Sequence, residues 1–230
     1  MLQLCPNGGR TAAHVPDTPP RLAAAVRASG LGDVHLHPRD AHGAETMEPA
    51  HVAEAVAAVR AAAPGVAVGV TTAAWIEPDP ARRAALVRSW TVLPDHASVN
   101  WHEDGADLVA EALLERGVGV EAGLFSGTDA AARFLAWPRA DRVLRVLAEV
   151  TDTDPATAPG TAESLLTDLA PVARPILLHG EEGGAWPVLR LAARLGLSTR
   201  IGLEDTLLLP DGAPAPDNTA LVNAARALLS

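Results

Sequence analysis

Residues 33–73 decide the fold, and they read DVHLHPRDAHGAETMEPAHVAEAVAAVRAAAPGVAVGVTTA. A short apolar run at Asp33–His37 is followed by an alanine-rich segment of helical length, Glu48–Ala63, and then by a second apolar run, Val66–Ala73. This order of strand, helix and strand is typical of a βαβ unit, in which the two strands lie parallel in one sheet.

The same alternation continues outward in both directions and gives eight strand–helix pairs. The expected strands are Leu2–Asn7, Asp33–His37, Val66–Ala73, Ala97–His102, Val118–Leu124, Val143–Thr151, Pro175–Gly180 and Thr199–Glu204. The expected helices are Pro19–Ser29, Glu48–Ala63, Pro80–Trp90, Ala106–Arg116, Gly127–Ala136, Thr161–Ala170, Ala185–Leu195 and Asn218–Leu229. Eight strands fit a closed barrel better than an open doubly wound sheet, which is the alternative. We therefore predict an α/β fold, a (β/α)₈ TIM barrel, as a single catalytic domain over residues 1–230.

The composition narrows the chemistry. With 230 residues, 48% of them apolar, the chain can bury one large core. A formal charge of −10 without a basic run argues against binding to nucleic acid or anionic membranes, so a small soluble substrate is expected. The sequence contains no lysine, which excludes Schiff-base aldolase, pyridoxal phosphate and Walker-type nucleotide sites. Proton transfer must then be carried out by His, Asp, Glu or bound water, and this shortage of groups favours a metal-dependent reaction.

The expected compartment is the cytoplasm. Cys5 is the single cysteine, so no intrachain disulfide can form. The first residues lack a basic segment followed by a long apolar run, and no later stretch reaches the roughly 20 apolar residues of a membrane span.

Polar residues fall at the ends of all eight expected strands, where the active sites of barrels lie. These residues are Asn7, His35, His37, Thr71, Thr72, Asn100, His102, Glu121, Glu149, His179, Glu204 and Asp205. One or two polar residues at strand ends would be explained by the hydrogen bonds that loops need. A contribution from every strand predicts a catalytic site at the carboxyl ends of the strands.

The two histidines of Asp33–His37 are separated by one residue, which places both imidazoles on the same face of the strand. Two inward histidines suit zinc. The HxH motif alone is equally compatible with two hydrogen-bonded core histidines. A third ligand is needed to favour the metal.

The last expected strand offers that ligand in the run from Arg200 to Asp205. Arg200, Gly202 and Glu204 share a parity, so Glu204 should face the interior at the mouth and complete a His₂Glu set with an open position. Asp205 follows at the turn, where its carboxylate can swing into the site. The alternatives are a metal-free ion pair between Glu204 and Arg200, and a loop cap formed by Asp205.

With these motifs in place, the sequence resembles the β-keto acid cleavage enzymes, the family of 3-keto-5-aminohexanoate cleavage enzyme. The matching segments run from end to end of the chain. They are Asn7-Gly-Gly-Arg10-Thr, His35-Leu-His37-Pro-Arg39-Asp40, Gly69-Val-Thr-Thr-Ala-Ala-Trp75, Ser98-Val-Asn100-Trp, Gly119-Val-Glu121-Ala-Gly and Arg200-Ile-Gly-Leu-Glu204-Asp205.

The resemblance implies a zinc ion on His35, His37 and Glu204. It also implies a reaction that condenses a β-keto acid with acetyl-CoA and gives acetoacetate and a new acyl-CoA, through reverse-Claisen cleavage of a carbon–carbon bond. Asp205, oriented by Arg200, would accept the proton. Members of the family are often tetramers, and the apolar outer helices of this chain permit a homo-oligomer, a dimer or a tetramer, without requiring one.

Two further residues take their expected roles from the same resemblance. Thr71 would hydrogen-bond the substrate or relay a proton, and Glu121 would contact a polar substrate group. The chain departs from many members by its shorter length and by Thr-Ala-Ala after the third strand. Neither departure affects the expected metal ligands, but both bear on substrate choice and on the binding of CoA, for which we assign no residues.

Two other functions compete with this one. An amidohydrolase-like metal-dependent hydrolase also carries HxH in a barrel, although normally at the end of the first strand, and its binuclear forms need a lysine that this chain lacks. A barrel that retains zinc without catalysis is the second alternative. Asn100, His102 and His179 are left without a specific role. Four further histidines are interpreted as surface residues: His14, His42, His51 and His96.

Overall fold

The computed structural model describes residues 1–229, and in them eight parallel strands form one sheet in the order β7-β6-β5-β4-β3-β2-β1-β8. The strands are β1 (Leu2–Leu4), β2 (Asp33–Leu36), β3 (Ala67–Val70), β4 (His96–Asn100), β5 (Gly119–Phe125), β6 (Arg145–Val150), β7 (Ile176–Gly180) and β8 (Thr199–Ile201). Between β7 and β8 the ring is completed by a parallel bridge, in which Leu178 N donates to Ser198 O at 2.9 Å.

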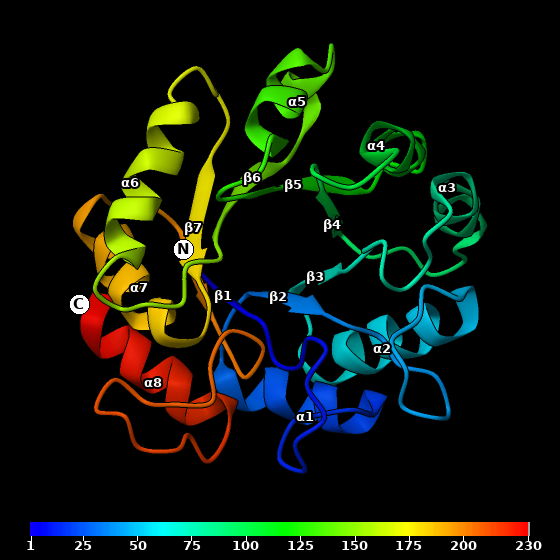
Figure 1. Ribbon diagram of the computed structural model, residues 1–230. Coiled ribbons are helices and arrows are strands. Elements are labelled where there is room, and N and C mark those ends of the chain that lie inside the picture. Colours follow the sequence, from blue (N-terminus) through cyan, green and yellow to red (C-terminus); the bar gives the residue numbers. More distant parts are fainter. Residues whose placement is uncertain (230) are drawn as a thin grey trace.

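Helices surround this ring on the outside (Figure 1). They are α1 (Pro19–Ser29), α2 (Pro49–Ala62), α3 (Pro80–Ser89), α4 (Ala106–Glu115), α5 (Ala130–Ala136), α6 (Ala158–Asp168), α7 (Ala185–Arg194) and α8 (Asn218–Leu229). Eight parallel strands covered by eight helices in residues 1–229 confirm the predicted (β/α)₈ barrel in a single domain. Over this described range, no helix has the length and apolar character needed to cross a membrane.

The helices begin and end where local chemistry dictates. Proline occupies the first turn of α1, α2, α3 and α6, where its missing N–H costs nothing. Asp79 caps α3 by accepting a hydrogen bond from Ala81 N at 2.9 Å. Gly30 ends α1 in the left-handed conformation, with φ of 61°. These signals explain why the expected helix bounds lie within a few residues of the observed ones.

Several strands are shorter than expected, and β8 shows the physical reason. It ends at Ile201 because the chain turns at Gly202, whose backbone packs directly on Cys5, the residue after β1: a Cβ at this position would lie 1.9 Å from Cys5 O. Glu204 therefore lies in a turn, with its N–H donating to Cys5 O at 3.2 Å. The prediction that Glu204 belongs to the last strand is therefore wrong. Its side chain reaches the interior through the turn instead.

His96 is a second correction, because it is buried rather than on the surface. It opens β4 with only 1% of the residue exposed. Gly69 on the neighbouring strand makes the room, since a Cβ there would lie 2.1 Å from His96 Cε1. Sequence patterns missed it because the residue lies at a strand boundary, where a loop was expected.

Candidate metal centre

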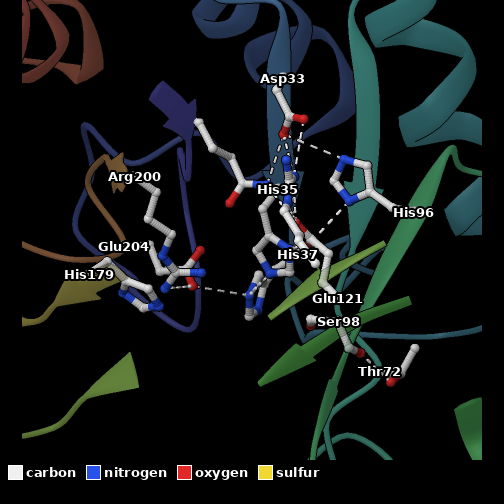
Figure 2. Close-up of polar contacts among 12 residues, drawn as sticks. Asp33, His35, His37, Thr72, His96, Ser98, Glu121, His179, Arg200 and Glu204 are labelled. Carbon is white, nitrogen blue, oxygen red and sulfur yellow. Dashed lines mark hydrogen bonds and ion pairs between the residues drawn. The ribbon is translucent and has the colours of Figure 1, made fainter. Parts of the chain in front are cut away.

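Three of the predicted site residues converge at the carboxyl ends of the strands. Nε2 of His35 lies 3.1 Å from Nε2 of His37, and that nitrogen of His37 lies 3.5 Å from Glu204 Oε1. One ligand atom from each residue lies within 4.8 Å of the other two. Figure 2 shows the two imidazoles between Glu204 on one side and Glu121 on the other.

These separations fit a shared divalent cation. Zinc–nitrogen bonds of about 2.0–2.1 Å at tetrahedral angles place two ligand atoms about 3.3–3.4 Å apart. The observed 3.1 and 3.5 Å lie on either side of that value. Glu204 Oε2 is in addition a buried oxygen without a hydrogen-bond partner. Such an acceptor is costly to bury unless a cation satisfies it.

His37 is held from both sides. Its backbone is clamped by Asn7, which donates from Nδ2 to His37 O at 2.7 Å and accepts at Oδ1 from His37 N at 3.1 Å. Its Nδ1 contacts Glu45 Oε1, and the other oxygen of Glu45 accepts from Trp75 Nε1 at 3.0 Å. Burial lowers the pKa of His37, but the carboxylates of Glu204 and Glu45 outweigh burial and raise this pKa to about 9.

His35 has the opposite electrostatics. Burial lowers its pKa to about 4, so the imidazole is neutral at physiological pH and has a nitrogen lone pair free for a metal. Its Nδ1 lies 3.8 Å from Glu121 Oε2. The pKa values of the two neighbouring histidines therefore differ because Glu204 and Glu45 both contact the ring of His37, whereas the charges of Glu204 and Glu121 do not outweigh burial at His35.

Asp205 stands beside Glu204 with its carboxylate bound at both oxygens. Arg200 Nε donates to Oδ1 at 3.1 Å, and the Cys5 thiol donates to Oδ2 at 2.7 Å. Arg200 also contacts Glu204 Oε1 through Nη2 at 2.9 Å, so one guanidinium braces both carboxylates. Asp205 is 1% exposed, and burial raises its pKa. A buried carboxylate with a raised pKa is suited to accept a proton.

Two cavities meet these residues. The larger, of about 220 Å³, is lined by His37, Arg200, Glu204 and Asp205 together with Gly8, Gly9, Trp75, Phe125, Glu149, Val150, Thr151, His179 and Glu181. The smaller, of about 30 Å³, brings Thr71, Ser98 and Asn100 next to His35. The structure thus places Thr71 beside the candidate metal ligands. Glu121 is fully buried, and it is not among the described residues that line either cavity.

Sequence reasoning missed several residues of the site. Glu45 lies in a loop, where no periodicity points inward, and Cys5 and Gly8 looked like ordinary strand-end residues. Gly8 matters because its φ of +53° and its missing Cβ make room for Glu204, whose Cγ would lie 2.5 Å from such a Cβ. Glu181 also lines the wall of the larger cavity, and its place just after the seventh strand was the available signal. His179 and Glu149, which the sequence placed at strand ends, line the same wall.

Comparisons with known proteins agree with the fold and add a family. The chain is similar to 3-dehydroquinate dehydratase from Geobacillus kaustophilus HTA426, with 14% identity, a TM-score of 0.60, and coverage of 99% of this chain and 89% of the other. It is similar to the 3-dehydroquinate dehydratase from Aquifex aeolicus VF5, with 13% identity, a TM-score of 0.59, and coverage of 100% and 97%. At these identities the likeness shows the fold alone. No curated protein matches the sequence. The family model for beta-keto acid cleavage enzyme, however, matches residues 1–230. The chain therefore belongs to the β-keto acid cleavage enzyme family.

Proposed function

We propose that this member of the family is a zinc-dependent enzyme that transfers the CH₂–COO⁻ unit of a β-keto acid to acetyl-CoA. The bond between the β-carbonyl carbon and the α-carbon breaks, acetoacetate forms, and the remaining acyl group leaves as a new acyl-CoA. The observation that carries the proposal is the convergence of His35, His37 and Glu204 beside the braced carboxylate of Asp205.

The residues proposed to hold the zinc are the two imidazoles, through Nε2, and the carboxylate of Glu204. When bound, the ion supplies Lewis-acid polarisation of the keto oxygen, which a chain without lysine cannot achieve through an iminium. His₂Glu leaves a coordination position open for substrate. Glu204 Oε2, without a hydrogen-bond partner in the structure, supports this assignment.

Asp205 is proposed to take the proton from the α-carbon. Arg200 and Cys5 hold its two oxygens, so the carboxylate cannot rotate away from the cavity it lines. Its burial keeps water away and raises its pKa, which makes it a stronger base than an exposed aspartate. Thr71, next to the ligands, is proposed to hydrogen-bond the substrate or to relay this proton.

The size of the site suits a short substrate at the reacting end. The larger cavity, of about 220 Å³, is below the roughly 300–1,000 Å³ of pockets that hold drug-sized ligands. The pantetheine arm and phosphates of CoA would then extend outside it. Glu149 and Glu181 at the wall add negative charge, which argues for binding of the CoA phosphates away from this wall.

The decisive experiment uses zinc-loaded protein, a panel of β-keto acids and acetyl-CoA labelled with ¹³C in both acetyl carbons. Mass spectrometry should find acetoacetate that carries both labels in its acetyl half, and an unlabelled new acyl-CoA. Release of product without CoA would favour the hydrolase instead. Zinc binding without any product from the panel would favour the non-catalytic barrel. Asp205→Asn is the control, because it should keep the zinc and lose the labelled product.

A further inference from the structure

A buried ionic cluster lies inside the barrel directly behind His35. Asp33 on β2, His96 on β4, Glu121 on β5 and Arg145 on β6 meet there, and Gln3 on β1 completes the cluster. Figure 2 shows Asp33, His96 and Glu121 on the side of His35 that faces away from Glu204 and Arg200. None of these residues has a role in the proposed reaction. Burying so many charged groups costs free energy of folding unless every group is paired.

The cluster balances its own charge without a metal. Arg145 Nη2 lies 2.9 Å from Asp33 Oδ1 and 2.5 Å from Glu121 Oε1, so a guanidinium stands between the two carboxylates. His96 contacts Glu121 Oε2 through Nδ1 at 2.9 Å and Asp33 Oδ1 through Nε2 at 3.4 Å. Burial lowers the pKa of His96, but both carboxylates raise it to about 9, so the ring is a cation. Asp33, His96 and Glu121 have the spacing of a metal site, yet two protein cations already occupy it.

One oxygen of this balanced cluster points at the candidate metal centre. Glu121 Oε2 lies 3.8 Å from His35 Nδ1, and both are fully buried atoms without a hydrogen-bond partner of acceptable geometry. The other oxygen, Oε1, is engaged by Arg145 Nε at 2.6 Å and by Gln3 Nε2 at 3.0 Å. Oε2, whose close partner is the His96 cation at 2.9 Å, thus also faces the one unsatisfied nitrogen of His35, while Oε1 fixes the carboxylate in place.

We propose that Glu121 is a positioning residue for the metal ligand His35: its Oε2, 3.8 Å from Nδ1, attracts the Nδ1–H electrostatically, so that the Nε2 lone pair is turned toward the ion. The inference rests on the metal site proposed above. A neutral imidazole carries a single proton, and a carboxylate that faces one nitrogen favours the proton there and leaves the other nitrogen to ligate. Arg145 and His96 keep Glu121 in its anionic, accepting form. Glu45 gives His37 a carboxylate at the same ring position.

The first test needs no mutation. Nitrogen-15 NMR of zinc-loaded wild-type protein, with the His35 signals assigned from a His35→Gln variant, should show the proton of His35 on Nδ1 and the metal on Nε2. A proton on Nε2 with Nδ1 bound to zinc would overturn the proposal. A wild-type protein that binds no zinc at all would instead refute the metal assignment itself, so the two failures are distinct.

The second test measures zinc affinity by competition with a chelator. Glu121→Gln keeps the shape of the side chain and removes its charge, and it should weaken zinc binding by about 10–100-fold, the usual effect of losing such a partner. Gln3→Met is the matched control, because it removes two hydrogen bonds from the cluster and leaves Oε2 facing His35. Its zinc affinity should stay close to that of the wild type. Equal affinities of a folded Glu121→Gln variant and the wild type would overturn the inference, as would an equal loss in Gln3→Met.

Discussion

Gly8→Ala should disable the metal centre without removing any ligand. The added Cβ would lie 2.5 Å from Cγ of Glu204 and 3.1 Å from its Cβ and Cδ. The shortest contact falls about 1 Å short of the optimum of roughly 3.5–4.0 Å between carbon atoms. Glu204 must therefore move by about 1 Å, whereas metal–ligand distances tolerate about 0.2 Å. We expect zinc affinity to fall by at least about 100-fold, the upper end of what loss of an outer partner costs.

The chain offers two controls for the separate parts of this effect. Gly43 also has a positive φ, of +82°, but nothing lies within 4 Å of its added Cβ, so Gly43→Ala carries the backbone strain alone. Gly9 in the same loop as Gly8 would place its Cβ 3.4 Å from Glu45 Oε2, an ordinary contact. Strain in the left-handed region costs about 1–2 kcal/mol, which in a chain of this size lowers Tm by about 2–8 °C.

The assay is zinc affinity by chelator competition, with thermal unfolding of the zinc-free proteins measured in parallel. Gly43→Ala should lose the thermal stability that backbone strain costs, Gly8→Ala should lose at least as much because of its added contact with Glu204, and only Gly8→Ala should lose zinc. If Gly8→Ala binds zinc as tightly as Gly43→Ala does, the close approach of this loop to Glu204 does not position that ligand.

Three further predictions concern the proposed base Asp205, the carboxylate of Glu45 that contacts His37, and the pH dependence of stability. Asp205→Asn should keep zinc and lower kcat by about 10²–10⁴-fold, because the proton acceptor is lost; full activity would exclude the assigned role. Glu45→Ala should weaken zinc binding by about 10–100-fold, since Nδ1 of His37 loses its carboxylate, and chelator competition measures this. For His96, the pKa of about 9 in the folded protein lies above the ordinary histidine value of 6.5, so the native state binds an extra proton between these two pH values. The contribution of His96 to the free energy of unfolding of the zinc-free protein should be largest below pH 6.5 and should be lost as the pH rises toward 9. Urea unfolding at several pH values should show that this slope shrinks in His96→Gln.

Sequence periodicity predicted the barrel because each strand and helix carries its own local signals. The alternation around residues 33–73 recurs along the chain, and the prolines that begin helices mark their starts. Strand ends were predicted less well. Where β8 stops is decided by a contact between Gly202 and Cys5, nearly two hundred residues apart in sequence, and no local pattern records such a contact.

As with the fold, the sequence predicted those parts of the site that depend on local geometry. The spacing of His35 and His37 places them together from local geometry alone, and the structure brings Glu204 to them through a turn rather than a strand face. The partners that orient these residues come from loops and distant strands, so they required three-dimensional information. Glu121 shows the difference, since its strand was foreseen and its burial beside His35 was not.

X-ray absorption of the zinc-loaded protein tests the convergence of His35, His37 and Glu204 most directly. We expect one zinc per chain, nitrogen and oxygen ligands at about 2.0–2.2 Å, and the outer scattering of two imidazoles. A sulfur ligand, which only Cys5 or a methionine could supply, or a zinc that keeps two imidazoles in His35→Ala, would contradict it.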